Sequence, residues 1–295
     1  MNEIQCIGAI FAALLGLAFG SFLNVVLIRL PEDESIVTPR SHCRNCDHTL
    51  AWWENLPLLS WILLRGRCRS CHVAISWRYP LTEVVIAVLW TGCWLHFGPP
   101  LWAANSAEAL TSRLLVHSLI AIVGNCLLCW LLTALAALDA EYFWLPNLLT
   151  YPGVALGILF TLEQAWSSSD TFLPGNLLHV AWHCMLAILA ACGLILFIRL
   201  AYWIVRRQEG MGLGDAKLMA MLGAWLGIRG SMESFIVAML TAAAAAFVWL
   251  LVLVVRGKTS EWAKMPLPFG TFLAVSALVE VFYPLWILGH LQIGF

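Results

Sequence analysis

Eight long apolar segments constrain this chain more than any other feature of its sequence. A helix that crosses the core of a bilayer needs about 20 mostly apolar residues. Hydrophobic residues make up 61% of the 295 residues and charged residues only 11%, whereas soluble domains are nearer half apolar and a quarter charged. The sequence therefore predicts an all-α polytopic membrane protein. Its predicted transmembrane helices lie at about 6–28, 79–97, 114–138, 148–163, 177–203, 213–228, 233–255 and 268–289.

The positions of Lys and Arg predict how these helices are oriented, because positive charges gather in cytoplasmic loops. An outer N-terminus places all but two of the 16 Lys and Arg residues inside, the exceptions being Arg113 and Arg229. The C-terminus is then also outside, and the long loop 31–78 is cytoplasmic. The lipid bilayer is one partner of such a chain. A net charge of −1 argues against nucleic acid as another.

The cytoplasmic loop carries two C-x2-C pairs, formed by Cys43, Cys46, Cys68 and Cys71. Each pair can offer two thiolates to one ion, and four thiolates complete a structural zinc site. Two disulfides would use the same residues, but disulfides seldom persist on the reducing side of the membrane. The spacing therefore favours zinc. We expect three regions: a first transmembrane helix at 1–30, a zinc-binding domain at 31–78 and a seven-helix membrane domain at 79–295.

Two aspartates stand at the ends of apolar segments. Asp139 ends the third segment and Asp215 opens the sixth, so both are predicted at the cytoplasmic face. Acidic residues at a membrane span are costly and often functional. Two close carboxyl groups can share a proton, so that one acts as a general base and the other as a general acid. Alternatively, each aspartate is an independent helix cap or interfacial anchor, and the spacing leaves both interpretations open.

A run of alternating glycines, Gly210, Gly212 and Gly214, precedes Asp215. Glycine has no side chain, so the backbone of a peptide could lie against this segment beside the aspartate. Lys217 follows two residues after Asp215. The pattern matches neither the dinucleotide-binding glycine motif nor the P-loop. We therefore interpret these three glycines and Lys217 as candidate substrate-binding residues.

Several motifs, taken in order, resemble those of the type IV prepilin leader peptidase family, whose members are bacterial inner-membrane enzymes of the G-x-G-D aspartic protease class. They are "GSFLNVVLIRLP" at 20–31, the paired-cysteine loop, "LDAEYFWLPNLLT" at 138–150, "GMGLGDAKL" at 210–218 and "PLPFGTFLA" at 266–274. Arg44 and Thr271 depart from the family pattern, in which proline is common at both positions. Neither residue is expected to touch a catalytic group.

The resemblance implies two activities. The enzyme would cut the basic leader of type IV prepilins or type II secretion pseudopilins after a glycine, at the cytoplasmic face of the bacterial inner membrane. It would then methylate the new N-terminal amine with S-adenosylmethionine. Asp139 and Asp215 match the catalytic aspartates of the family, and the cysteine loop matches a domain associated with methyl transfer. The sequence contains no Rossmann-like glycine loop that would mark the S-adenosylmethionine site.

Two other functions compete with this interpretation. A presenilin-like intramembrane aspartic protease, without methyltransferase activity, shares G-x-G-D but expects its first aspartate in the middle of a helix. A proton-coupled transporter could use Asp139 and Asp215 as relay groups. Such a transporter predicts more charge at mid-membrane and internal repeats, and the sequence contains neither.

Overall fold

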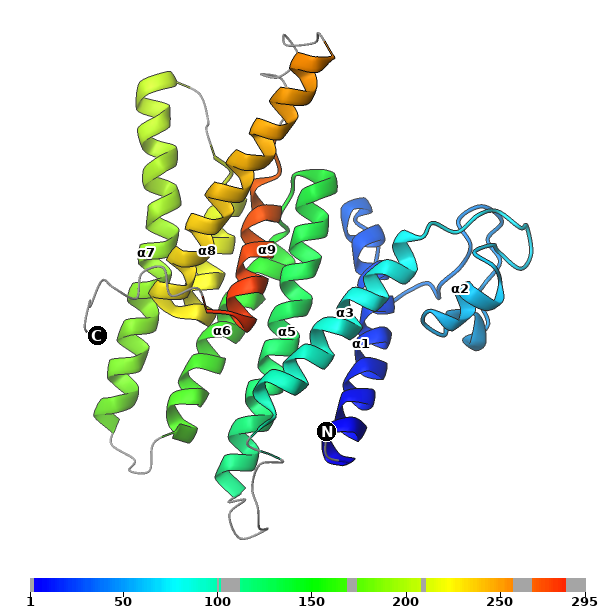
Figure 1. Cartoon of the computed structure of the whole chain (residues 1–295), viewed down its shortest axis with the longest axis horizontal. Coiled ribbons are helices and arrows are strands. Elements are labelled where there is room, and N and C mark those ends of the chain that lie inside the picture. The colour runs from blue at the N-terminus through cyan, green and yellow to red at the C-terminus, as the bar shows by residue number, and fades with distance from the viewer. Residues whose placement is uncertain are drawn as a thin grey trace. The chain divides into compact units, whose positions relative to one another are not determined.

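The computed structural model describes residues 3–99, 101, 112–168, 174–207, 211–256 and 267–284. The regular elements in this part of the chain are all helical (Figure 1), which confirms the all-α part of the predicted fold class. The α-helices are α1 (Glu3–Arg29), α2 (Leu59–Leu63), α3 (Arg78–Phe97), α5 (Ser112–Tyr142), α6 (Asn147–Ser168), α7 (Pro174–Arg206), α8 (Leu213–Val255) and α9 (Phe269–Phe282). Two 3-10 helices, η1 (Leu30–Glu32) and η2 (Trp52–Asn55), lie in the loop between α1 and α3.

Six helices of the described residues are long and apolar enough to cross a membrane: α1, α3, α5, α6, α7 and α8. The sequence predicted eight spans. Two of them, 213–228 and 233–255, lie together in α8, which has 43 residues. A third, 268–289, corresponds to α9, an apolar helix of 14 residues. The chain is therefore a multi-pass membrane protein. Its helices α8 and α9 differ in length from the predicted spans.

Gly227 divides α8 into two helical parts, because its φ of 70° and ψ of −175° are not helical. A straight helix of 43 residues would be about 65 Å long. However, α8 and α9 both begin beside the side chain of Leu145, since a Cβ on Gly214 or Gly270 would lie 3.1 Å or 3.0 Å from it. If α8 were straight, its end would therefore lie about 65 Å from the region where α9 begins. The segment that links the two helices could span at most about 50 Å, so α8 cannot run straight through Gly227.

The chain forms two compact units, Met1–Trp130 and Leu131–Phe295. In the first unit, α1 packs closely against α3 through two small residues one turn apart. A Cβ on Gly16 would lie 2.6 Å from Cα of Ala87, and a Cβ on Gly20 would lie 2.6 Å from Cα of Glu83. Small residues at this spacing let the backbones of two membrane helices approach each other.

In the second unit, α6 is fastened to the first part of α8 by hydrogen bonds between side chain and backbone. Trp225 Nε1 donates to the carbonyl of Gly153 at 2.8 Å, and Thr161 Oγ1 donates to the carbonyl of Ala224 at 2.7 Å. Polar groups in an apolar environment are costly unless they are paired. These bonds hold the part of α8 just before Gly227 against α6.

Replacing Gly227 with alanine should lower the melting temperature of the detergent-solubilised protein. Among the described residues, an added Cβ would meet nothing within 4 Å. The cost therefore comes from the backbone conformation, which is essentially restricted to glycine and strains another residue by about 1–3 kcal/mol.

Gly193→Ala is the matched control. A Cβ there also meets nothing within 4 Å among the described residues, but Gly193 lies inside helix α7, where alanine is favoured over glycine. We expect its melting temperature to be unchanged or higher. Equal losses in the two variants would contradict the bend at Gly227.

Candidate active site and metal centre

Asp139 lies in the last turn of α5 and is only 6% exposed. Thr271, at the start of α9, donates two hydrogen bonds to Oδ2 of Asp139, from its N–H at 2.6 Å and from its hydroxyl at 3.1 Å. Gly270 permits this approach, because a Cβ on it would lie 2.9 Å from the carboxyl carbon of Asp139. The carboxyl group is therefore held by donors in the first turn of a helix, where N–H groups lack the usual partner four residues earlier in the helix.

The expectation that Thr271 would not touch a catalytic group is wrong if Asp139 is catalytic. Both polar groups of this residue bind Asp139. A proline at this position would have no N–H to donate. The two residues are 132 positions apart, so only the tertiary structure could reveal the contact. Arg44, the other departure, instead pairs with Glu32 at 2.7 Å and Glu34 at 3.5 Å.

Asp215 lies in the first turn of α8 and is 8% exposed. Its Oδ2 accepts a hydrogen bond from the N–H of Gly212 at 3.3 Å. Gly212 is the N-cap residue, and Asp215 is the third residue of the helix, as in a capping box. The carboxyl group of Asp215 also lies close enough to Asp139 for the two charges to interact. The structure therefore places the two aspartates near each other, and Asp215 also caps the start of α8.

Leu145 explains why the two aspartates meet. This residue lies in the connection between α5 and α6 and is 7% exposed. A Cβ on Gly214, next to Asp215, would lie 3.1 Å from Leu145, and a Cβ on Gly270 would lie 3.0 Å from it. Leu145 therefore packs between the start of α8 and the start of α9. A leucine in an apolar sequence carries no signal of this role, so the sequence did not reveal it.

The candidate substrate-binding residues lie in different surroundings. Gly212 and Gly214 flank the start of α8 beside Asp215, whereas Gly210 lies outside the described residues. Lys217 donates from Nζ to Oδ1 of Asn147 at 2.6 Å. It also lies over the ring of Tyr151, 5.4 Å from the ring centre. Lys217 thus links α8 to the start of α6, and its role toward a substrate stays a prediction.

The four loop cysteines form a cluster in the first unit. Their sulfur atoms all lie within 4.8 Å of one another. The Sγ atoms of Cys43 and Cys71 are 3.8 Å apart, and those of Cys46 and Cys68 are 4.0 Å apart. These distances suit neighbouring ligands rather than covalently bonded sulfurs. The cluster could hold a metal ion, and four sulfur donors suit a tetrahedral ion.

Two turns of the same design present the cysteines. In each turn the N–H of the first cysteine donates to the carbonyl five residues later, from Cys43 to His48 and from Cys68 to Val73, both at 2.9 Å. In each turn the residue after the second cysteine has a φ of 57°. The sequence pattern C-x2-C therefore folds into two equivalent knuckles that aim their sulfurs at one point.

Backbone donors favour the thiolate form within this cluster. The N–H of Val73 and, less strongly, the side-chain amide of Asn45 lower the pKa of Cys71 to about 6. The Asn45 nitrogen lies 3.5 Å from the sulfur. The thiolate is the form that binds a metal, so this arrangement prepares Cys71 at neutral pH. The N–H of His48 lowers the pKa of Cys46, but burial and the other three sulfurs outweigh it and raise that pKa to about 11.

Glu54 is a buried acid that the sequence did not distinguish from surface carboxylates. It is 5% exposed. Its Oε2 accepts a hydrogen bond from the N–H of Ala51 at 2.8 Å and lies 3.2 Å from Nε2 of His48. The Ala51 N–H, followed by His48, lowers the pKa of Glu54. Its other oxygen, Oε1, is buried and has no hydrogen-bond partner among the described residues.

Two family models and several known proteins match this chain. Residues 14–97 match the Bacterial Peptidase A24 N-terminal domain, and residues 126–247 match the Type IV leader peptidase family. The chain is 34% identical to the prepilin leader peptidase/N-methyltransferase of Burkholderia pseudomallei (strain 1026b) over 303 residues, which cover 92% of this chain and 84% of that protein. It is 32% identical to the protein of the same name from Aeromonas hydrophila over 297 residues, which cover 92% and 89%.

A protein of the same name from Myxococcus xanthus (strain DK1622) is 38% identical over 245 residues, which cover 82% of this chain and 63% of that relative. No solved structure matches the chain significantly. The fold and the site define a multi-pass helical membrane protein with a candidate aspartic dyad. The chain belongs to the type IV prepilin leader peptidase/N-methyltransferase family, peptidase A24.

The purified protein should contain about one metal ion per chain. Cys68→Ser should lose most of this metal, because three thiolates cannot close the tetrahedron. Metal content per chain can be measured by mass spectrometry of the digested protein. Cys192→Ser is the control, since Cys192 lies on α7 outside the cluster and its loss should leave the metal in place. Equal metal content in the two variants would exclude the cluster as the binding site.

Proposed function

We propose that this protein is a prepilin leader peptidase and N-methyltransferase. It removes the basic leader from type IV prepilins or type II secretion pseudopilins after a glycine, and then methylates the new N-terminal amine. One observation carries the proposal: two buried aspartates from α5 and α8 interact where three helix ends meet. Membership of the leader peptidase family supports the substrate class.

The two aspartates perform the hydrolysis as a pair. One carboxylate takes a proton from a water molecule, whose oxygen attacks the carbonyl carbon of the scissile peptide bond. The other carboxyl group, which is protonated, gives its proton to the leaving amine, and that amine becomes the new N-terminus. The hydrogen bonds from Thr271 fix the position of Asp139 during these steps. Since the groups interact, their titration belongs to the pair.

The membrane arrangement that fits this reaction has eight crossings. We count α8 as two crossings, because it cannot run straight through Gly227, and α9 as the eighth. An outer N-terminus then places the cysteine loop, the end of α5 and the starts of α8 and α9 in or near the cytoplasm. A basic leader stays on that side of the membrane, so the scissile bond reaches the aspartates from the cytoplasm.

The remaining groups support this function. Gly212, Gly214 and the preceding Gly210 leave room for the substrate backbone beside Asp215, with Lys217 close by. The cysteine cluster binds zinc, which stabilises the loop domain as a closed four-sulfur site. S-adenosylmethionine supplies the methyl group when it is bound. A presenilin-like protease without methyl transfer and a proton-coupled transporter are both disfavoured by the names of the relatives.

Asp139→Asn and Asp215→Asn should each reduce the rate of leader cleavage by about 10²–10⁴-fold or more, the range for loss of a general acid or base. Cleavage is measured by product mass with a full-length prepilin, after equal amounts of inserted protein have been confirmed. Glu141→Gln is the control, because it neutralises an exposed carboxylate two residues from Asp139. This variant should cleave normally. Normal cleavage by either asparagine variant would remove that aspartate from the mechanism.

The two activities should be separable. Methyl transfer to a neutral amine depends on positioning and does not need the dyad as an acid. Asp215→Asn should therefore still methylate a pre-cleaved pilin whose N-terminal amine is free. Cys68→Ser should lower methylation more than cleavage, because the cysteine loop and the aspartates belong to different units. Both variants are tested with both substrates, and equal loss of both activities in both would indicate a single fused site.

A further inference from the structure

The two carboxyl groups of the dyad are buried to a similar extent, but their hydrogen bonds are unequal. Asp139 accepts two bonds from Thr271, at 2.6 Å and 3.1 Å, and the N–H of Gly270 also interacts with this carboxyl group. Asp215 accepts a longer bond from the N–H of Gly212, at 3.3 Å. Donors that bind a carboxylate favour its charged form. When the pair holds one proton, the negative charge is therefore better placed on Asp139 than on Asp215.

The hydroxyl group of Thr271 can respond to the charge of Asp139. Its oxygen lies 3.1 Å from Oδ2 of Asp139 and 3.1 Å from the carbonyl oxygen of Ala136. A hydroxyl group has one proton to donate, and a charged acceptor forms the stronger bond. The hydroxyl therefore donates to Asp139 while that group is charged. It can turn to Ala136 when Asp139 becomes neutral, so it keeps a partner in both states.

Both donors of Thr271 bind the same oxygen, Oδ2 of Asp139. This arrangement engages one oxygen and leaves proton exchange to the other, Oδ1. The titratable group that interacts with Asp139 from α8 is Asp215. The contacts from α9 come from Gly270 and Thr271, and Leu145 packs beside Gly270 from the α5–α6 connection. The charge of Asp139 therefore depends on the donors of α9 and on the proton of Asp215.

We propose that Thr271 is a positioning residue that makes Asp139 the general base of the dyad and Asp215 its general acid. The inference rests on the proposed function. Oδ1 of Asp139 takes a proton from water, and the water oxygen bonds to the scissile carbonyl carbon. When the C–N bond breaks, the leaving nitrogen keeps the electron pair and takes the proton of Asp215. The pair then holds its one proton on Asp139, and transfer of that proton to Asp215 completes the cycle.

The pH profile of leader cleavage by the purified full-length protein tests this assignment. The acid limb of kcat/KM reports the base, and the basic limb reports the acid. Thr271→Val keeps the N–H but removes the hydroxyl, so that charged Asp139 loses a donor. Its acid limb should move to higher pH by about one unit, while the basic limb stays in place. Thr271→Ser keeps both donors and should show the wild-type profile.

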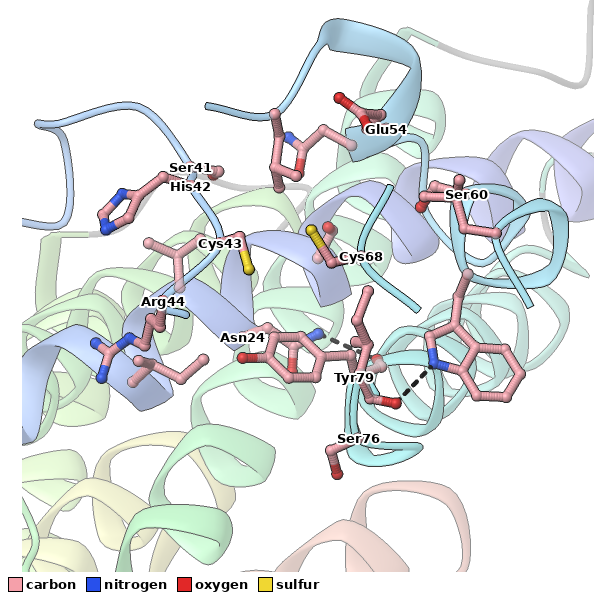
Figure 2. Close-up of a pocket in the computed structure, with 18 of the residues that line it drawn as sticks. Asn24, Ser41, His42, Cys43, Arg44, Glu54, Ser60, Cys68, Ser76 and Tyr79 are labelled. Atoms are coloured by element: carbon pink, nitrogen blue, oxygen red, sulfur yellow. Dashed lines mark hydrogen bonds between the residues drawn. The ribbon is translucent and has the colours of Figure 1, made fainter. Parts of the chain in front are cut away.

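Two variants that remove a hydroxyl group elsewhere serve as controls. Thr91→Val acts on α3, where the hydroxyl donates to the carbonyl of Ala87 at 2.7 Å. Ser60→Ala acts on the lining of a cavity of about 550 Å³ between the cysteine loop, the end of α1 and the start of α3 (Figure 2). Neither aspartate of the dyad lines this cavity. Both variants should therefore keep the wild-type profile.

The position of each limb decides the outcome. A shift of the basic limb in Thr271→Val would make Asp139 the acid. Unmoved limbs, with or without a loss of rate, would leave Thr271 with no influence on the charge of Asp139. Either result would overturn the inference and leave the proposed function intact. A wild-type protein that leaves the prepilin uncut would overturn both.

Discussion

The contact between Asp139 and the first turn of α9 organises the second unit. Two hydrogen bonds from Thr271 and the close approach of Gly270 fix the carboxyl group at the end of α5. Leu145 then packs against both Gly270 and Gly214 and so brings Asp215 to the same place. A reactive pair of carboxyl groups must be held in position by its surroundings, since small displacements are costly to catalysis. Here the ends of three helices and one apolar side chain provide that support.

The first unit contains a different candidate site, the cluster of four cysteines. Its loop domain has no extended apolar core and depends on a cluster of four sulfurs, presented by two equivalent turns. A metal ion held by the four sulfurs would stabilise a small domain of this kind. The same loop encloses a cavity beside the end of α1, with one buried carboxylate oxygen left unpaired. The sulfur cluster and the two aspartates therefore belong to different units, each with its own structural support.

The sequence predicted those features that depend on local pattern. Apolar length predicted the helices, and the C-x2-C spacing predicted the sulfur cluster. The positions of Asp139 and Asp215 at the ends of apolar segments placed both aspartates at the same face of the membrane. It could not predict features that depend on long-range packing. Nothing in the sequence indicates that Thr271 binds Asp139, which lies 132 residues away. The sequence does not distinguish Glu54 from other acids of the loop, and only the structure shows that it is buried. The bend at Gly227 depends on a backbone conformation that no neighbouring motif indicates.

The most direct test of the account is one reaction with the wild-type protein. A full-length prepilin is incubated with the purified enzyme, with and without S-adenosylmethionine, and the products are analysed by mass spectrometry. The account predicts a pilin cut after the glycine of its leader in both reactions, and one added methyl group on the new N-terminus only when S-adenosylmethionine is present. An intact prepilin in both reactions would contradict it.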